Sequence, residues 1–293
     1  MSAVTYLING ISLGAVYAII ALGYTMVYGI AKMLNFAHGD VIMIGSYVIF
    51  SVVSMANMPV PLGIILSIIV CTALGVTIEK IAYKPLRGAS SLAVLITAIG
   101  VSYFLQNIAL LIYGANTKAF SSVVSIGGIS LFDGQVNISG ETIVTILSCL
   151  VIMIVLTLFV NKTKAGQAML AVSEDKGAAQ LMGINVNGTI SLTFAIGSGL
   201  AAVAGMLLCS SYPALTPYTG SMPGIKAFVA AVFGGIGSIP GALIGGLILG
   251  IIEIMSKAYI SSQLSDAIVF MVLIVVLLVK PTGLLGKKIQ EKV

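Results

Sequence analysis

The sequence predicts an all-α, polytopic membrane protein. Hydrophobic residues make up 59% of its 293 residues and charged residues only 8%, whereas a soluble domain carries roughly 25% charged residues. Apolar runs of membrane-spanning length recur along the chain, which favours transmembrane helices over the period-two alternation of a β-barrel. The 33 glycines suit close helix packing. We therefore expect one transmembrane helical bundle over residues 1–293.

Apolar runs and basic clusters together predict nine membrane segments. Basic residues before the second run and after the third mark cytoplasmic loops, so the N-terminus is expected outside and the C-terminus inside. The glycine-rich stretch FGGIGSIPGALIGG should break the long run near the C-terminus into two short helices. A single crossing there would give eight segments and place the basic tail outside, against the positive-inside rule. The expected runs are 4–30, 41–55, 62–82, 90–113, 141–161 and 190–210, then two within 226–255, and 265–279.

The second apolar run is short and follows the polar stretch MLNFAHGD. It is predicted to begin inside the membrane plane as a broken or re-entrant helix, with Asn35 or Asp40 capping its first N–H groups. A similar pattern, a breaker followed by glycine and a short apolar helix, recurs after the glycine-rich break, and paired broken helices often flank a transport path. Residues 114–140 are expected to form an external loop containing a small hairpin.

Residues 162–187 form a polar island between two membrane-length apolar blocks, and its lysines place it in the cytoplasm. Ser173 before two acids favours a helix start, and Gly183 with Asn185 favours a stop. The helix would carry a small apolar face. From spacing alone, a linker helix packed on its own protein and a docking helix for a soluble partner remain equally open. The residues of the apolar face are Ala178, Ala179, Leu181 and Met182.

Residue types that carry chemistry are scarce. The chain has one histidine and three cysteines, Cys71, Cys149 and Cys209, all in apolar stretches and therefore expected as buried thiols. No P-loop pattern occurs, so ATP binding through this motif is excluded. Since the net charge of +5 comes from lysines between spans and at the C-terminus, topology explains it better than nucleic-acid binding. We expect no catalysis, metal or cofactor on this chain.

The acids bear on how transport would be driven. Each falls near a predicted span end, and an ion-coupled carrier usually needs ionisable groups deep in its bundle. This distribution argues against a secondary carrier for small amino acids, urea or amides. A passive channel, with backbone carbonyls of the glycine-rich break as its filter, stays open as another alternative. The acids are Asp40, Glu79, Glu141, Glu253 and Asp266.

Three stretches, at the beginning, middle and end of the chain, are the most distinctive: NGISLGAVYAIIALGYTMVYGIAKMLNFAHGD, AVSEDKGAAQLMGINV and FGGIGSIPGALIGG. Together they resemble the permease subunits of branched-chain amino acid ABC importers of the LivH type. The resemblance implies a multi-pass subunit in the cytoplasmic (inner) membrane of a prokaryote, moving aliphatic amino acids by alternating access. It also implies four kinds of partner: a second related permease, two ATP-binding cassette ATPases, an extracytoplasmic solute-binding protein and membrane lipid.

Two groups of site residues are predicted. The resemblance implies that the cytoplasmic loop couples to the ATPases, through Ser173, Glu174, Asp175, Ala178 and Gly183. The translocation path is expected along polar residues and breaks in the spans, although the amides also suit interhelical hydrogen bonds, and His38 and Asp40 also suit structural and capping roles. The residues expected on the path are Asn9, Asn35, His38, Asp40, Gly235, Gly237 and Pro240.

Overall fold

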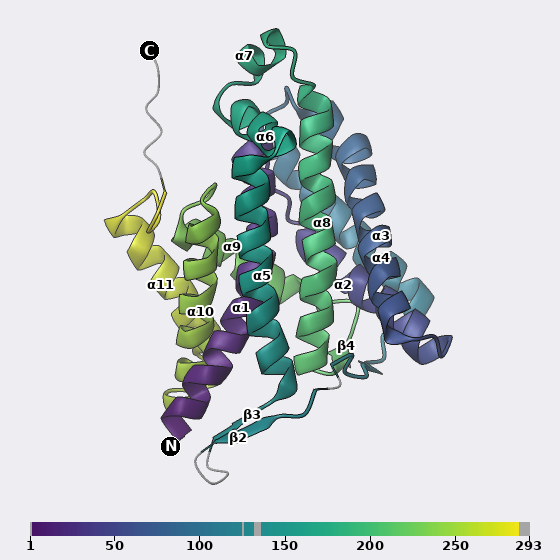
Figure 1. Cartoon of the computed structure of the whole chain (residues 1–293), viewed down its shortest axis with the longest axis vertical. Coiled ribbons are helices and arrows are strands. Elements are labelled where there is room, and N and C mark those ends of the chain that lie inside the picture. Colours follow the sequence, from purple (N-terminus) through teal and green to yellow (C-terminus); the bar gives the residue numbers. More distant parts are fainter. Residues whose placement is uncertain (1, 125, 132–135, 287–293) are drawn as a thin grey trace.

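The computed structural model describes residues 2–124, 126–131 and 136–286. This part of the chain is built almost entirely of α-helices, which pack side by side into one bundle (Figure 1). Short strands lie at one end of the bundle and the small helices α6 and α7 at the other. The helices are α1 Ser2–Ala31, α2 His38–Phe50, α3 Val60–Ile78, α4 Ser91–Tyr113, α5 Gly140–Lys162, α6 Lys164–Glu174, α7 Lys176–Leu181, α8 Val186–Ser211, α9 Ser221–Gly234, α10 Ile239–Tyr259 and α11 Ser265–Val279.

Within the described residues, seven helical stretches are long and apolar enough to cross a bilayer, which confirms the polytopic all-α class. They include α2 and α3 with their irregular continuations, which are π-helical turns at Ser51–Met55 and Glu79–Tyr83 and a 3₁₀ turn at Lys84–Leu86. Each of the nine expected segments falls on an apolar helix. However, α9 and α11, with 14 and 15 residues, are shorter than the roughly 20 residues that a bilayer requires.

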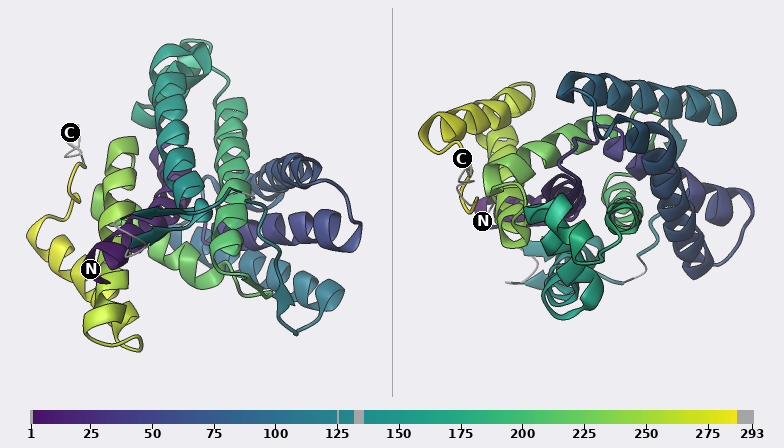
Figure 2. Two further views of the ribbon diagram at one scale, coloured as in Figure 1. Left: turned by 60° about the horizontal axis from the view of Figure 1, so that its bottom comes forward. Right: turned by 90° about the horizontal axis from the view of Figure 1, so that it is seen from above.

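Helix α1 lies at the centre of the bundle. Seen along the bundle, it is ringed by α5, α8, α9 and α10 (Figure 2). Its seam with α10 depends on glycine, because no side chain fits between the two backbones. A Cβ on Gly14 would lie 2.7 Å from the Cα of Leu247, and a Cβ on Gly250 would lie 2.2 Å from the nitrogen of Gly14. Such close approach is typical of small-residue packing in membranes.

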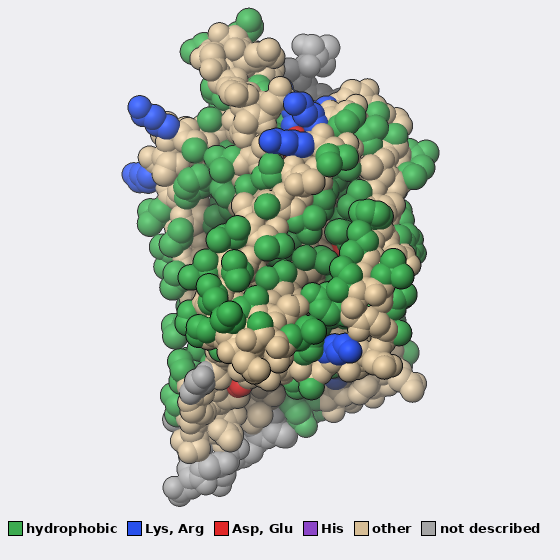
Figure 3. Space-filling view, turned by 90° about the vertical axis from the view of Figure 1, so that its right-hand side faces the viewer, with side chains coloured by type: hydrophobic (Ala, Val, Ile, Leu, Met, Phe, Trp, Pro, Cys, Tyr) green, Lys and Arg blue, Asp and Glu red, His purple; other side chains and the backbone are tan. Residues whose placement is uncertain are grey.

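A second layer lies beyond α8. Helix α8 packs against α2 and α3, and α4 lies on the outside (Figures 1 and 2). The outer face of this layer is broadly apolar (Figure 3), as expected for a surface that contacts lipid. Between the helices, all three cysteines are buried as free thiols, which confirms that prediction.

Two small antiparallel sheets mark the end of the bundle near the N-terminus, here called the hairpin end. Strand β2 (Ile129–Leu131) pairs with β3 (Val136–Ile138), so the predicted hairpin is present, with residues 132–135 outside the described part. Strand β1 (Lys118–Ala119) pairs with β4 (Ala214–Leu215), a contact that the sequence did not suggest. The opposite end, which carries α6 and α7, is called the α7 end.

The predicted break before α2 exists, but its predicted cap is wrong. After α1 the chain turns back and α2 begins at His38, with Ala37 at the N-cap and no side-chain capping hydrogen bond. The Oδ1 atom of Asn35 instead accepts from the Tyr83 hydroxyl at 2.9 Å, and Asp40 accepts from the Gln106 amide at 2.8 Å. Since these partners come from the continuation of α3 and from α4, tertiary contacts have replaced the local cap.

The glycine-rich break is confirmed as the join between two helices. Helix α9 ends at Gly234, and Gly235 and Gly237 follow with φ of 104° and 93°, a conformation that side chains rarely adopt. Ser238 then caps α10 by accepting from the Gly241 amide at 3.2 Å. The chain after α11 returns to this point, where the Leu284 amide donates to the carbonyl of Phe233 at 2.8 Å.

Candidate functional site

The polar loop at the α7 end folds into two short helices rather than one. Thr163 caps α6, and Asp175 caps α7 by accepting from the Ala178 amide at 2.9 Å. The predicted helix start at Ser173 is therefore wrong: its hydroxyl donates to the Leu170 carbonyl at 2.7 Å, inside the last turn of α6. A reversal of the chain requires a residue in extended geometry, and Asp175 takes it with φ of −153°.

Helix α7 presents its apolar residues outward. Leu181 is 90% exposed and Met182 is 82% exposed, whereas Ala179 is buried. Gly183 ends the helix with φ of 82°, as the sequence predicted. The four residues expected to form a small apolar face are thus divided: Ala179 is buried, and the two largest side chains are almost fully exposed. Exposed apolar groups at a polar tip are typical of an interaction surface.

The two small helices are attached to the bundle. Helix α6 packs against α1, α5 and α8, and the Lys176 ammonium donates to the carbonyl of Ala31, the last residue of α1, at 3.0 Å. Partial burial and the nearby cations Arg87 and Lys32 lower the pKa of Lys176. A displacement of α7 would therefore be transmitted directly to the end of α1.

Deep in the bundle, the first turns of α2 and α9 meet at a contact that we call the α2–α9 junction. Glycine makes it possible: a Cβ on Gly39 would lie 2.5 Å from the carbonyl oxygen of Gly220. Polar groups surround the contact, because the Gln106 amide that binds Asp40 also lies 3.3 Å from the Ser221 hydroxyl. Two broken helices that meet in this way are a recurrent arrangement at transport paths.

The structure gathers only some of the residues that the sequence assigned to a path. Asn35, His38 and Asp40 are all buried at the start of α2, and the ring of His38 packs 4.7 Å from that of Tyr24. The Nε2 atom of His38 has no hydrogen-bond partner among the described residues. Asn9, by contrast, is exposed toward the other end of α1.

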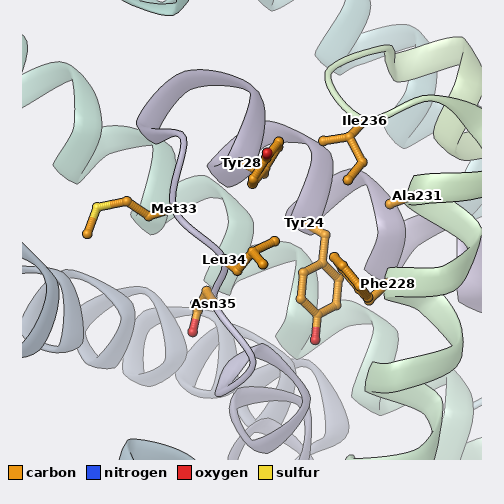
Figure 4. A pocket seen from close by; sticks show the side chains of 8 residues that line it. All are labelled: Tyr24, Tyr28, Met33, Leu34, Asn35, Phe228, Ala231 and Ile236. Atoms are coloured by element: carbon orange, nitrogen blue, oxygen red, sulfur yellow. The ribbon is translucent and has the colours of Figure 1, made fainter. Parts of the chain in front are cut away.

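A small apolar hollow lies between the glycine-rich break and the segment that precedes α2. Figure 4 shows its walls, which come from the last turns of α1, the segment that precedes α2, and α9 with the residue that follows Gly235. Gly237 and Pro240 lie exposed beyond it. The hollow thus brings Asn35 near the break, although they are far apart in sequence. Its lining residues are Tyr24, Tyr28, Met33, Leu34, Asn35, Phe228, Ala231 and Ile236.

A cluster of charges joins α9, α10 and α11, with Glu253 and Lys226 buried and Lys257 and Asp266 partly exposed, and sequence reasoning missed it. The Glu253 carboxylate accepts from Lys226 at 2.8 Å, from Lys257 at 2.6 Å and from the Tyr17 hydroxyl at 2.8 Å, while Lys226 also lies 2.7 Å from Asp266. Two cations and two anions balance here. The available signal was the single lysine and single glutamate inside an otherwise apolar run.

The acids lie near helix ends, as the sequence predicted, but the inference that they stay out of the bundle interior is wrong. Glu253 is 1% exposed, Asp40 is 2% exposed and Glu79 is fully buried. Each has a partner that offsets its desolvation: Glu79 accepts from Arg87 and from the Ser191 hydroxyl. The described part of the chain holds no group of three or more potential ligands placed to bind a metal.

Comparisons with known proteins agree along almost the whole chain. Residues 6–277 match the family model described as the permease component of branched-chain amino acid transport systems. The chain is 47% identical to the high-affinity branched-chain amino acid permease LivH of Salmonella typhimurium, over 97% of this chain and 96% of that protein. It is 46% identical to BraD of Pseudomonas aeruginosa over 98% and 97%. A probable LivH of Methanocaldococcus jannaschii is 30% identical over 92% and 88%.

Proposed function

The chain belongs to the family of permease components of branched-chain amino acid transport systems, and from this premise we propose that it carries leucine, isoleucine or valine into the cell. It is a transport subunit rather than an enzyme. The observation that carries the proposal is the sequence identity of 46–47% to permeases named for this transport, over nearly their full length. ATP hydrolysis on partner subunits would supply the energy.

The same sequence identity also bears on the rival interpretation, an ion-coupled carrier. An ion-coupled carrier usually holds ionisable groups inside its bundle, and this chain does hold them, at Glu253 and Lys226. The distribution of charge therefore no longer argues against a carrier. The family match argues against it, and the buried charges here are paired with one another, as structural ion pairs are.

We propose that the α7 end faces the cytoplasm. The residues on this side of the spans are rich in lysine, and the hairpin end contributes few basic groups to the described chain, which fits the positive-inside rule. The N-terminus would then lie outside and the C-terminus inside the cytoplasmic membrane. The basic residues of the loops expected inside are Lys32, Lys80, Lys84, Arg87, Lys162, Lys164 and Lys176.

Residues 162–187 would bind one ATPase subunit. The second ATPase subunit would bind the second permease. Exposed Leu181 and Met182 supply an apolar contact, and Glu174 and Asp175 supply charge beside it. Since Lys176 holds the end of α1 and α6 packs on three long helices, movement of α7 would reach the bundle. Closure of the ATPases would thereby switch the opening between outside and inside.

The substrate path would pass the α2–α9 junction. Asn35, His38 and Asp40 lie together there, and the polar N-terminal ends of two short helices face into the bundle. Backbone N–H groups at helix starts suit the carboxylate of an amino acid, and the surrounding apolar residues suit its aliphatic side chain. An extracytoplasmic binding protein would deliver the substrate at the hairpin end.

The docking role is tested with the assembled importer in vesicles. The double variant Leu181→Ser, Met182→Ser should lose most ATP-driven leucine uptake at unchanged membrane abundance, because both side chains are exposed and contribute nothing to packing. Leu92→Ser is the control, since Leu92 is 64% exposed at the same end but on α4. Unchanged uptake by the double variant would refute docking through α7. Uptake of urea in preference to leucine would refute the proposed substrate.

A further inference from the structure

A cavity of about 280 Å³ opens at the α7 end, between α7, the start of α8 and the turn that precedes α4. It is several times the roughly 30 Å³ that one water occupies, so a tetrahedral oxyanion fits with water to spare. No part of the proposed transport path or of the exposed tip of α7 lies in it. Its lining residues are Arg87, Lys176, Gln180, Ile184, Asn185, Val186, Asn187 and Ile190.

The charge of the cavity is positive. Arg87 and Lys176 line it, and Lys32 is near enough to act on Lys176. The acid beside them, Glu79, is fully buried and already accepts from Arg87 and Ser191. Two cations thus line the cavity, a third lies nearby, and no carboxylate is among the described residues that line it. An anion from solution would neutralise this excess of positive charge.

The neutral groups of the cavity also favour an anion. Asn185 caps α8 by accepting from the Gly188 amide at 2.9 Å, so the amides of Val186 and Asn187, in the first turn of this 26-residue helix, stay at the rim of the cavity. The positive end of the helix dipole lies at the same place. Within the described chain the Nε atom of Arg87 is buried without a hydrogen-bond partner. The terminal nitrogens of Arg87 already donate to Asn187 and Glu79, so the first-turn amides of α8 and the positive charge are what converge on this space.

The cavity lies where the spans end. It is formed at the first turn of α8 and just before α4 begins, and basic side chains gather near this end of the face shown in Figure 3, above a wide apolar area. Lipid headgroups occupy this depth, and basic pockets between helices at the cytoplasmic surface are known to hold acidic headgroups. A free phosphate offers the same chemistry.

We propose that this cavity is a binding site for a phosphate group, supplied by the headgroup of an acidic phospholipid or by free phosphate. The phosphate oxygens would accept from Lys176, Arg87 and the first-turn amides of α8. Because Lys176 belongs to α7, a bound phosphate would tie α7 to α8 and to the turn before α4. The site is independent of the substrate path, and binding at it does not require the proposed direction or substrate of transport.

The test measures binding to the assembled importer rather than transport. Complexes in phosphatidylcholine nanodiscs, with or without phosphatidylglycerol, are compared for retained acidic lipid by native mass spectrometry. A second arm titrates inorganic phosphate into lipid-depleted complexes in neutral detergent and follows the thermal midpoint. Lys176→Gln should weaken binding by about fivefold, the effect expected of one basic side chain near an acidic surface.

Two further variants make the result decisive. Asn187→Asp is nearly isosteric, exposed and keeps the oxygen that accepts from Arg87, so it should fold while its charge neutralises Arg87 and repels phosphate, even if Lys176→Gln does not fold. Lys84→Gln removes an equal charge from an exposed lysine outside the cavity and should bind normally. Loss with phosphatidylglycerol alone identifies a lipid site, and loss with phosphate identifies a free-anion site. Equal binding by wild type and both cavity variants, or equal loss with Lys84→Gln, would overturn the proposal.

Discussion

The α1–α10 seam and helix α7 use apolar and small residues in opposite ways. Along the seam, glycines allow backbones to meet, and a Cβ on Gly250 would overlap Gly14. At α7, Leu181 and Met182 project from the molecule with 90% and 82% exposure. The difference separates a surface that is complete within the chain from one that a partner would complete. Substitutions should therefore damage the subunit itself at the seam and only its assembly at α7.

The strongest test of this contrast is Gly250→Leu. The new side chain must push apart two backbones that touch, so the loss of stability should exceed the roughly 1–3 kcal/mol of ordinary overpacking. We expect little subunit in the membrane, measured by quantitative immunoblotting. The matched control is Gly100→Leu on α4, where a Cβ meets no atom within 4 Å. Normal abundance of Gly250→Leu would show that the seam is more adaptable than its geometry implies.

A second test concerns the buried charges beside the seam. Glu253→Ala leaves Lys226 with Asp266 alone and removes the acceptor of the Tyr17 hydroxyl. Loss of one partner from a buried pair costs about 3–5 kcal/mol, which should appear as a lower thermal midpoint of the purified subunit. Glu174→Ala, at an exposed acid, should leave the midpoint unchanged. Equal midpoints for both variants would place this cluster in water rather than in the core.

The smallest expected effect on stability is at α7. Asp175→Ala removes the side chain that caps the helix, at a cost of about 1 kcal/mol confined to that helix. Faster hydrogen exchange of the α7 amides, without a change in the rest of the bundle, is the expected result. Ser173→Ala should not reproduce it, because the Ser173 hydroxyl bonds only within α6. The reverse pattern would restore Ser173 as the helix start.

The sequence by itself determined the class and the approximate positions of the long helices. Apolar runs between charged loops locate each membrane segment, because a helix in lipid satisfies its own backbone and needs only a continuous apolar surface. Gly183 and the Gly235–Gly237 break were also predictable, since positive φ is a local property of glycine. Resemblance of three stretches added the family, and the full-length comparison confirmed it.

Only the tertiary structure decided how polar groups are paired. Asp40 was predicted to cap its own helix, yet it bonds Gln106, 66 residues away. Lys226 meets Glu253 across 27 residues, so charges that lie near helix ends form a partly buried network. Helix periodicity carries no information on which faces meet. Inside a membrane, a polar group bonds whichever partner the packing brings within reach, because no water competes for it.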